Sequence, residues 1–361
     1  MRLVFFGLSL SSSWGNGHAT TYRALLRGLA RRGHDILFLE REQPWYADNR
    51  DLTDPDFCRL RLYRSLAELE DFATAIARAD AVIIGSYVPD CADLLRWVEV
   101  RRRGILGFYD IDTPVTLSRL ETGEWDYLAP WMIPYFDLYF SFTGGPTLRR
   151  LEQQYGARQA HALYCSVDAD AYSPTGAERR WDLGYLGTYS PDRQGALETL
   201  LLEPARSLPN KRFVVAGPQY PAEIAWPANV ERIEHLPPAE HGDFYSSLGW
   251  TLNVTRADMI RAGYSPSVRL FEATACGTPV ISDIWPGIET IFAPGRELRL
   301  VQTSDEVTAA LALPGAQRYA IGMAGRERTL REHTANRRAE ELENRLLALA
   351  PLASRPLVVG A

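Results

Sequence analysis

The segment from Ser265 to Asp283 constrains the fold more than any other, because it encodes a loop, a helix, a turn and a strand in succession. Ser265 is a favourable N-cap residue, and Pro266 suits the first turn of a helix. Gly277 is expected to end the helix, and Pro279 prevents it from continuing into the apolar residues that follow. A helix that passes through such a turn into an apolar strand is typical of α/β proteins with parallel sheets.

The beginning of this helix carries groups that suit an anion. A helix N-terminus presents free N–H groups and a partial positive charge. Arg269 adds a full positive charge in the first turn, and Glu272 follows one turn later on nearly the same side. Together they suit a nucleoside diphosphate, with the N–H groups and Arg269 on the phosphates and Glu272 on the ribose hydroxyls. The plain alternative is a core helix whose arginine and glutamate form a solvated pair.

The same helix and turn resemble the nucleotide-sugar site of GT-B glycosyltransferases. Those enzymes carry Glu-Ala-x-Ala-Cys-Gly-x-Pro-Val-Ile, and the segment from Glu272 to Ile281 reads Glu-Ala-Thr-Ala-Cys-Gly-Thr-Pro-Val-Ile. The large retaining family of this fold has a second glutamate eight residues earlier, near the sugar, and Tyr264 stands there in this chain. The Ser-x-Arg-x-Phe-Glu form is more similar to the CgeB-like (spore-maturation) branch. This departure leaves the sugar and the stereochemistry open.

The resemblance also assigns a phosphate-binding loop in the second half of the chain. The family pattern is Gly-Arg-x-x-x-x-Lys, in which Gly187 matches, Thr188 replaces the arginine and Arg193 stands at the lysine position. An arginine can bind a diphosphate with two parallel hydrogen bonds. The plain alternative for Arg193 is an exposed arginine at a helix start. The expected donor-binding residues are therefore Gly187, Thr188, Arg193, Tyr264, Ser265, Ser267, Val268, Arg269 and Glu272.

A glycine-containing loop follows the first apolar strand, 3–8, and leads into a helix that ends near Gly33. The glycines at its first turn fit a strand–loop–helix–strand unit, but Gly15-Asn16-Gly17 lacks the third glycine of a dinucleotide fingerprint. The loop is similar to the glycine-rich, histidine-containing loop in the N-terminal domain of GT-B enzymes. That similarity makes Gly15, Asn16 and Gly17 an acceptor-side loop. The alternative is an ordinary strand-to-helix turn.

Three residues are candidates for catalysis, namely His18, Asp110 and Asp112. His18 begins a helix, whose dipole disfavours the protonated imidazole and so favours a base at neutral pH. The two aspartates follow a predicted strand, at the edge where open α/β sheets bind ligands. The aspartates could act as a base, but they would more naturally orient a sugar hydroxyl or hold His18. We expect His18 and Asp110 to be essential for the transfer step, and Asp112 to contribute less.

An Asp-x-Asp pair has two other interpretations. It could hold a divalent metal, as in GT-A glycosyltransferases, but that single-domain fold does not account for the second half of the chain. It could also cap a turn before Pro114.

Strands alternate with helices along the whole chain, and the pattern restarts near Leu183. Residues 165–174 resemble the interdomain segment of GT-B proteins. The expected fold is α/β, with two Rossmann-like domains whose parallel sheets face a cleft. Residues 1–165, with a C-terminal helix at about 334–350, form the expected acceptor domain. Residues 166–333 form the expected nucleotide-sugar donor domain.

The composition excludes several classes of protein. The net charge of −6 argues against a general nucleic-acid or anionic-membrane surface. The four cysteines show no paired spacing, which argues against a disulfide framework or a zinc site and favours the cytoplasm. No apolar run approaches the roughly 20 residues of a membrane span, and no cleavage pattern of a signal peptide is present.

The sequence thus predicts a metal-independent glycosyltransferase that uses a nucleotide sugar, expected to be a UDP-sugar, as its co-substrate and needs no other cofactor. The acceptor, whether a small molecule, a glycan or a protein, is left open, as are the sugar, the stereochemistry and the oligomeric state. Two other functions remain compatible with the pattern. One is a sugar-nucleotide epimerase or hydrolase with the same fold, and the other is a catalytically inactive nucleotide-binding assembly protein.

Overall fold

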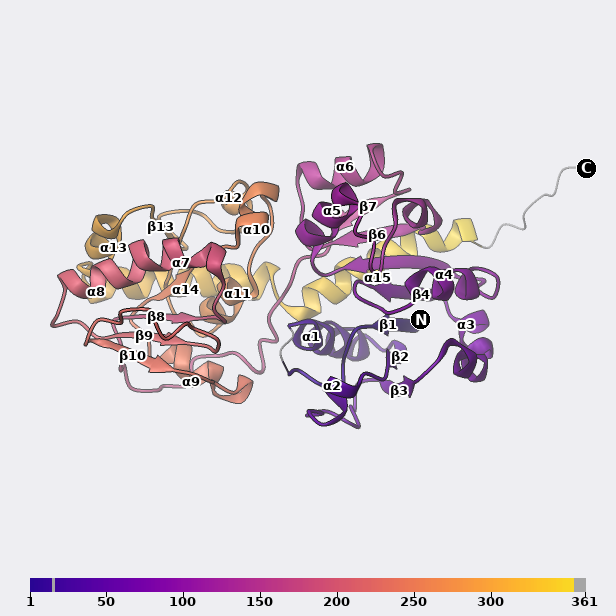
Figure 1. Cartoon of the computed structure of the whole chain (residues 1–361), viewed down its shortest axis with the longest axis horizontal. Helices are drawn as coiled ribbons and strands as arrows, with labels where there is room; N and C mark the ends of the chain where they lie inside the picture. The colour runs from indigo at the N-terminus through magenta and orange to yellow at the C-terminus, as the bar shows by residue number, and fades with distance from the viewer. Residues whose placement is uncertain (15–16, 354–361) are drawn as a thin grey trace, which may run out of the picture. The chain divides into compact units, whose positions relative to one another are not determined.

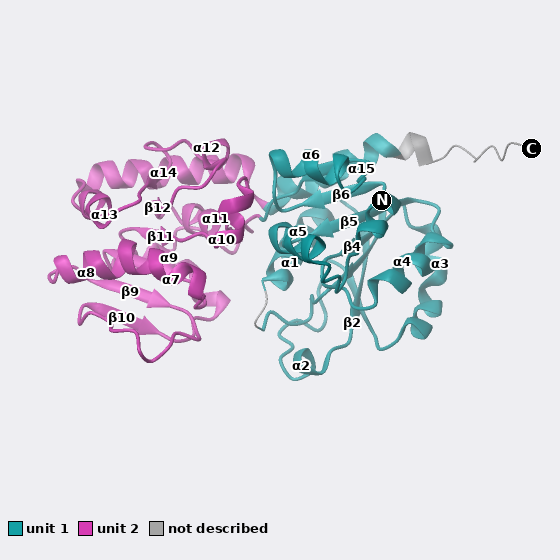
Figure 2. Ribbon diagram, turned by 45° about the horizontal axis from the view of Figure 1, so that its top comes forward, with its two compact units in different colours: residues 1–165, 335–361 teal, residues 166–334 magenta. Residues whose placement is uncertain are grey.

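The computed structural model describes residues 1–14 and 17–353, which form two compact units (Figures 1 and 2). Unit 1 contains Met1–Cys165 and the C-terminal segment that begins at Ala335. Unit 2 contains Ser166–Thr334. Gly15 and Asn16, which the sequence assigns to the acceptor-side loop, lie outside the described residues.

Unit 1 is built on a seven-stranded sheet in which every neighbouring pair is parallel. Its strands are β1 (Arg2–Gly7), β2 (Asp35–Arg41), β3 (Arg59–Tyr63), β4 (Ala81–Gly85), β5 (Ile105–Asp110), β6 (Leu138–Ser141) and β7 (Ala160–Ala162). Their order is β3-β2-β1-β4-β5-β6-β7. The chain therefore reverses its direction across the sheet between β1 and β4, and open α/β sheets bind ligands outside such a switch point.

Helices cover the two faces of this sheet (Figure 1). The α-helices of unit 1 are α1 (His18–Arg31), α2 (Pro44–Ala47), α3 (Ala73–Arg78), α4 (Cys91–Glu99), α5 (Thr113–Thr122), α6 (Pro146–Gln153) and α15 (Ala335–Ala353). Two 3₁₀ segments, Leu66–Phe72 and Pro130–Tyr135, complete the set.

Unit 2 repeats the design with a six-stranded parallel sheet. Its strands are β8 (Leu183–Leu186), β9 (Phe213–Ala216), β10 (Val230–Ile233), β11 (Thr251–Asn253), β12 (Val280–Ser282) and β13 (Arg299–Leu300). The order β10-β9-β8-β11-β12-β13 places the switch point between β8 and β11. The carboxyl ends of these two strands are therefore the expected ligand site of this unit.

The helices of unit 2 begin with a continuous helical run after β8. It comprises α7 (Pro191–Leu197), a π-helical turn (Glu198–Leu202) and α8 (Glu203–Ser207). The remaining helices are the 3₁₀ turn Pro238–Glu240, α9 (His241–Ser246), α10 (Ala257–Ala262), α11 (Val268–Ala275), α12 (Ile288–Ile291), α13 (Ser304–Leu311) and α14 (Gly315–Glu332). A short break at 333–334 separates α14 from α15, so the C-terminal helix belongs to unit 1.

The C-terminal helix completes the core of unit 1. Its buried side chains Ala339, Leu342 and Leu346 pack in the same cluster as apolar residues of β1 and α1. The backbones of α1 and α15 also approach closely, because a Cβ atom at Gly28 would lie 2.7 Å from the carbonyl oxygen of Ala335. Unit 1 is therefore assembled from both ends of the chain.

The start of α11 differs from the sequence prediction. The N-cap residue is Ser267, whose side chain accepts a hydrogen bond from the backbone N–H of Arg269, and the helix begins at Val268. Ser265 and Pro266 precede the helix and form neither its cap nor its first turn. The prediction failed because two serines lie near the helix start, and the proline made the first of them look like the cap.

The cysteines form no disulfide within the described residues. All four cysteines are free thiols, and three of them are buried. Within residues 1–14 and 17–353, no helix combines the length and the apolar character that crossing a membrane requires.

Candidate functional site

In unit 2 the arginine of α11 is buried, not solvated. Arg269 is 7% exposed. Its Nε donates to the carbonyl oxygen of Leu186 at 2.5 Å, and its Nη1 donates to Oδ1 of Asn253 at 3.1 Å. The guanidinium also lies over the ring of Tyr185, 4.7 Å from its centroid. Arg269 therefore links the ends of β8 and β11, the two strands at the switch point.

The loop after β8 fits tightly against this arginine. A Cβ atom at Gly187 would lie 2.7 Å from Nη2 of Arg269 and 2.8 Å from the hydroxyl of Tyr185. Only glycine therefore leaves the guanidinium in place. The loop is also tied to the end of β9, because the N–H of Gly187 donates to Ala216 and the hydroxyl of Tyr220 donates to the carbonyl oxygen of Gly187.

Arg193, in the first turn of α7, returns to the same loop. Its Nη2 donates to the carbonyl oxygen of Thr188 at 2.6 Å. Its buried Nε meets no hydrogen-bonding partner within the part of the chain that the structure describes. Burial lowers the pKa of Arg193, and the nearby charge of Arg269 lowers it further. The structure thus brings two sequence-predicted cations to one place.

The second predicted feature of α11, Glu272, is 6% exposed. Its Oε2 accepts a hydrogen bond of 3.1 Å from the hydroxyl of Tyr245 in α9. The hydroxyl of Tyr172 also interacts with this carboxylate, and it lies 3.2 Å from Nδ1 of His241. The carboxylate is therefore held from α9 and from the segment that precedes β8. The burial of Arg269 and Glu272 excludes the solvated pair that the sequence left open.

A buried polar network extends from Asn253, the residue that accepts a hydrogen bond from Arg269. This network was not predicted from the sequence. Asn253 donates to Oδ1 of Asp283, and Thr255 donates to the same carboxylate through its N–H and its hydroxyl. Burial raises the pKa of Asp283. Asn253 is the last residue of β11, and Asp283 directly follows β12. A polar residue at the end of an apolar run is the sequence feature that could have indicated both of them as ligand-site residues.

Tyr264, at the position where the large retaining family has its second glutamate, has an unusual backbone. Its φ of 47° is left-handed, and its N–H donates to the carbonyl oxygen of Pro286 at 2.6 Å. Its ring lies against Gly287, because a Cβ atom there would approach Cδ1 of the ring to 2.4 Å. Non-glycine residues in this region cluster at functional sites, since their strain persists only where the surroundings enforce it.

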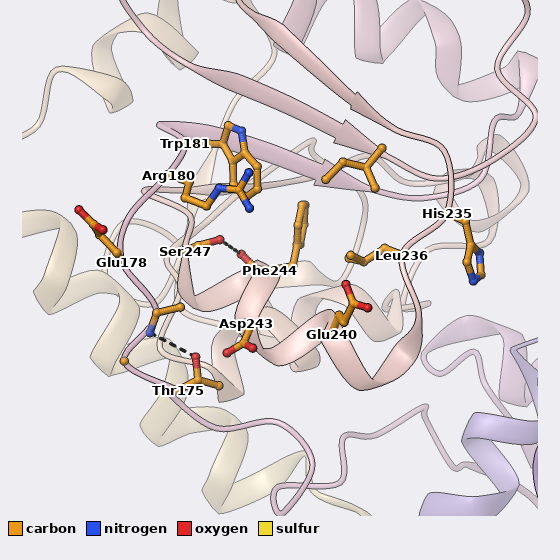
Figure 3. A pocket seen from close by; sticks show the side chains of 13 residues that line it. Thr175, Glu178, Arg180, Trp181, His235, Leu236, Glu240, Asp243, Phe244 and Ser247 are labelled. Atoms are coloured by element: carbon orange, nitrogen blue, oxygen red, sulfur yellow. Dashed lines mark hydrogen bonds between the residues drawn. The ribbon is translucent and has the colours of Figure 1, made fainter.

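A pocket of about 730 Å³ opens beside β10 and α9 in the same unit (Figure 3). Its aromatic wall contains Trp181 and Phe244, whose rings are 5.8 Å apart. Arg180 lies over the Trp181 ring, as Figure 3 shows. Leu236, in the loop after β10, lines this pocket. Its carbonyl oxygen lies 3.3 Å from Nε2 of His241, the histidine that also contacts the hydroxyl of Tyr172. None of the predicted donor-binding residues lines it.

In unit 1 the loop after β1 is held by two carboxylates that sequence reasoning did not single out. Glu40, buried at the end of β2, accepts hydrogen bonds from the N–H groups of Leu10 and Ser11 and from the Ser11 hydroxyl. Asp51 accepts from the N–H and hydroxyl of Ser13, and Arg23 of α1 binds it with two hydrogen bonds. These contacts hold residues 10–13, which follow the end of β1.

His18 is the first residue of α1, after the N-cap Gly17. Its ring makes an edge contact with Tyr87 at a centroid distance of 5.2 Å. Among the described residues, its buried Nδ1 meets no hydrogen-bonding partner. Burial lowers the pKa of His18 to about 4. The imidazole is therefore neutral at pH 7, as predicted, but burial rather than the helix dipole is the cause.

The two aspartates after β5 have different environments. The side chain of Asp110 is wholly buried, and it accepts hydrogen bonds of 2.6 Å from the hydroxyl of Tyr139 and 2.7 Å from that of Thr116. Burial raises the pKa of Asp110 to about 6. Asp112 is half-buried, and its Oδ2 accepts a hydrogen bond of 3.1 Å from the hydroxyl of Tyr87. The sequence predicts a larger effect on transfer for Asp110 than for Asp112, and of these two side chains only that of Asp112 has exposed surface.

The described residues contain no group of three or more His, Cys, Asp or Glu side chains arranged to hold a metal ion. Asp110 and Asp112 also contact each other, because the backbone N–H of Asp112 donates to Oδ1 of Asp110 at 3.3 Å.

Solved structures share the architecture of this chain over almost its whole length. Sucrose-phosphate synthase from Thermosynechococcus elongatus matches with a TM-score of 0.68 at 13% identity, covering 97% of this chain and 99% of that one. An α-glucosyltransferase in complex with UDP-glucose and abasic-site DNA matches with a TM-score of 0.70 at 13% identity, covering 96% and 99%. The chain has the GT-B fold. At these identities the likeness extends to the fold alone.

Two further comparisons concern the GT-B fold of this chain. Residues 193–344 match the family model described as glycosyl transferase-like. The Anabaena protein HepE in complex with UDP-glucose matches with a TM-score of 0.65 at 12% identity, covering 97% of this chain and 100% of that one. No curated protein is significantly similar to the chain in sequence. The matched residues include Arg193, Arg269 and Glu272.

Proposed function

We propose that this protein is a glycosyltransferase that moves a sugar from a nucleoside diphosphate donor, a UDP-sugar, to an acceptor hydroxyl. The observation that carries the proposal is the pair Arg193 and Arg269 at the end of β8. The hydrogen bonds of both guanidinium groups, within the described residues, go to carbonyl oxygens and to the amide of Asn253, not to a carboxylate. Two neighbouring guanidinium groups that have no hydrogen bond to a carboxylate favour the binding of an anionic ligand. A diphosphate carries enough negative charge to interact with both of them.

The chemistry follows from where charge develops. The acceptor oxygen forms a bond to the anomeric carbon, the bond from that carbon to the diphosphate breaks, and UDP leaves with the electron pair. The two arginines and the N–H groups at the start of α11 stabilise the negative charge that grows on the leaving diphosphate. Glu272 binds the ribose hydroxyls. The structures of HepE and the α-glucosyltransferase in complex with UDP-glucose support the choice of UDP.

We assign the acceptor side to unit 1. The neutral imidazole of His18 accepts the proton of the acceptor hydroxyl, and Asp112 orients that hydroxyl. Asp110 has no exposed surface, so its role is to position the end of β5 through Tyr139 and Thr116. The loop that contains Gly17 contributes backbone groups beside His18.

Three finer assignments belong to the same proposal. The enzyme transfers a hexose, it works without a metal because arginines and a helix N-terminus supply the positive charge, and it resembles the CgeB-like branch through its Ser-x-Arg-x-Phe-Glu segment. Adding a chelator should therefore leave the transfer rate unchanged within experimental error. A loss of activity that Mg²⁺ or Mn²⁺ restores would contradict the metal-independent mechanism.

The decisive experiment has two stages. A thermal-shift panel of nucleoside diphosphates and nucleotide sugars should identify UDP and one UDP-sugar as ligands that raise Tm. That sugar is then incubated with and without a panel of acceptors, and the products are identified by mass spectrometry. Transfer only with acceptor supports the proposal. An isomerised or free sugar without acceptor indicates an epimerase or hydrolase, and binding without turnover indicates an inactive binding protein.

A further inference from the structure

Tyr87 has a backbone conformation that bulky residues rarely adopt. It lies in the turn directly after β4, and its φ is 63°, in the left-handed region. A residue other than glycine keeps such a conformation only where its surroundings enforce it, and these residues cluster at functional sites. The turn follows β4, which together with β1 forms the switch point of the unit 1 sheet.

The side chain of Tyr87 packs against neighbouring side chains on more than one side. Its ring lies 4.4 Å from the ring of Tyr127, and the guanidinium of Arg119 lies over it at 5.7 Å. Arg119 in turn forms an ion pair with Asp126. These contacts come from α5 and the loop that follows it. They hold the ring in place and so enforce the left-handed backbone.

Two further contacts of Tyr87 go to the two groups that we assign to the acceptor. Its ring meets His18 edge-on, with a centroid distance of 5.2 Å and an interplanar angle of 81°. Its hydroxyl donates to Oδ2 of Asp112 at 3.1 Å. His18 follows β1 and Asp112 follows β5, so one side chain after β4 connects residues of both neighbouring strands.

We propose that Tyr87 is a positioning residue of the acceptor site, whose ring encloses the His18 imidazole and whose hydroxyl holds the Asp112 carboxylate. This inference rests on the proposed function of unit 1 as the acceptor side. It adds a residue that no sequence motif indicated.

The ionisation of these groups is consistent with this role. Burial, and then the charge of Asp112, raise the pKa of Tyr87, so its hydroxyl stays protonated and donates. Burial keeps His18 neutral. The titratable and charged groups in contact with Tyr87 are His18 of α1, Asp112 after β5, Arg119 of α5 and Tyr127 after it. Removing the ring should hydrate the imidazole and raise the pKa of His18 toward its ordinary 6.5.

The first arm of the test measures the His18 titration in the full chain by NMR of labelled histidine, with His18→Gln identifying its signal. Tyr87→Ala should raise the pKa of His18 from about 4 toward 6.5. Tyr87→Phe, which keeps the ring, should leave it unchanged, as should the control Tyr135→Phe at an exposed tyrosine of the same unit. A His18 that still titrates near 4 in Tyr87→Ala would overturn the shielding role.

The second arm measures transfer and UDP binding on the same variants. Tyr87→Phe should lower kcat by about tenfold or more, the loss expected for a hydrogen bond to a charged group, while the Kd for UDP stays within about twofold. Tyr135→Phe should match the unaltered protein in both measurements. Equal kcat values for Tyr87→Phe and Tyr135→Phe would overturn the positioning of Asp112.

A third variant keeps the test decisive if Tyr87→Ala folds poorly. Tyr87→Gly also removes the ring, but glycine adopts a φ of 63° without strain. Its Tm should exceed that of Tyr87→Ala, and its His18 should titrate in the same raised range. A Tm no higher than that of Tyr87→Ala would remove the strain argument. If the unaltered chain binds no UDP, the proposed function fails, and the His18 titration still decides the role of Tyr87.

Discussion

The two arginines of unit 2 are the residues on which donor binding depends most directly. If both neutralise the diphosphate, replacing either one with alanine should weaken UDP binding by about 1.5–3 kcal/mol, the range for hydrogen bonds to charged groups. Uridine, which lacks the phosphates, should lose little. Arg193→Lys should recover part of the affinity, because the family pattern has lysine there. Calorimetry with both ligands checks this, and an equal loss for uridine would indicate structural damage instead.

Arg193 is the cleaner of the two test positions. Arg269 is buried and donates to Leu186 and Asn253, so its removal leaves buried acceptors unpaired. Arg269→Ala should therefore also lower Tm. Arg193 makes one backbone contact, to Thr188, and its replacement should leave Tm nearly unchanged.

Glu272 offers a second prediction at the residue scale. Glu272→Gln should weaken UDP binding by about 1–3 kcal/mol, because a neutral amide accepts from the ribose hydroxyls less strongly than a carboxylate. The fold should persist, since the amide oxygen can still accept from Tyr245. Glu289→Gln, at an exposed position of the same unit, is the matched control and should bind UDP normally. Unchanged affinity in a folded Glu272→Gln protein would refute the ribose contact.

Asp110 makes the stability of the protein depend on pH. Its pKa is raised from the model-peptide value of 3.8 to about 6 by burial, so between these values the folded state retains a proton that the unfolded state has lost. The free energy of unfolding therefore falls as pH rises from about 4 to 6, by up to about 1.4 kcal/mol per pH unit from this one group. Asp110→Asn, which does not titrate, should lack this contribution.

The measurement for Asp110 is a pair of denaturant titrations across pH 4–7. The difference in unfolding free energy between Asp110→Asn and the unaltered protein should move in favour of the variant as pH rises, and level off above about pH 7. A difference that is constant across this range would mean that Asp110 titrates normally. Asp110→Asn should also lower the rate of transfer. Because Asp110 is buried, we expect this effect to arise from a shift in the end of β5 and not from a lost contact with the acceptor.

At the scale of elements, the close packing of the β8 loop on α11 makes a prediction about Gly187. Gly187→Ala places a methyl group 2.7 Å from Nη2 of Arg269, so the guanidinium must shift. UDP binding should weaken by at least about 1.4 kcal/mol, or tenfold, with the protein still folded. Gly195→Ala, in α7 with open space around it, is the control. It should bind UDP normally and gain about 0.5–1 kcal/mol of stability.

At the scale of the whole molecule, unit 1 depends on the far end of the chain. Leu342 of α15 is fully buried in the unit 1 core, whereas Leu347 on the same helix is 50% exposed. Leu342→Ala should cost about 2–5 kcal/mol of unfolding free energy, the range for buried leucine. Leu347→Ala should stay within about 0.5 kcal/mol. Chemical denaturation compares the two, and equal effects would mean that α15 does not support the core.

Truncation after Thr334 extends the same prediction. It removes the whole of α15 and with it the contacts of Ala339, Leu342 and Leu346 with unit 1. Hydrogen exchange should then show loss of protection in β1 and α1, while β8 to β12 of unit 2 keep theirs. Full protection of β1 in the truncated chain would contradict this assembly from both ends.

The features that depend on neighbours along the chain could be predicted from the sequence. Apolar runs separated by glycine and proline turns predict the strands, and their alternation with helices predicts the parallel sheets. The restart near Leu183 predicts a second Rossmann-like sheet, and both sheets are present. The Ser265–Asp283 segment predicted the helix that carries Arg269 and Glu272, with an error of two residues at its cap. These predictions succeeded because period and turn chemistry are local.

The contacts between residues far apart in sequence became visible only in the three-dimensional structure. Tyr87, Asn253 and Asp283 show no local motif, and they gain their partners because parallel pairing brings the ends of distant strands to one edge. The difference in burial between Asp110 and Asp112 also depends on strand pairing, because Tyr139 on the neighbouring strand β6 covers Asp110 and donates a hydrogen bond to it. Burial and strand order depend on contacts between residues far apart in sequence. Desolvation then lowers the pKa of His18 and raises that of Asp110.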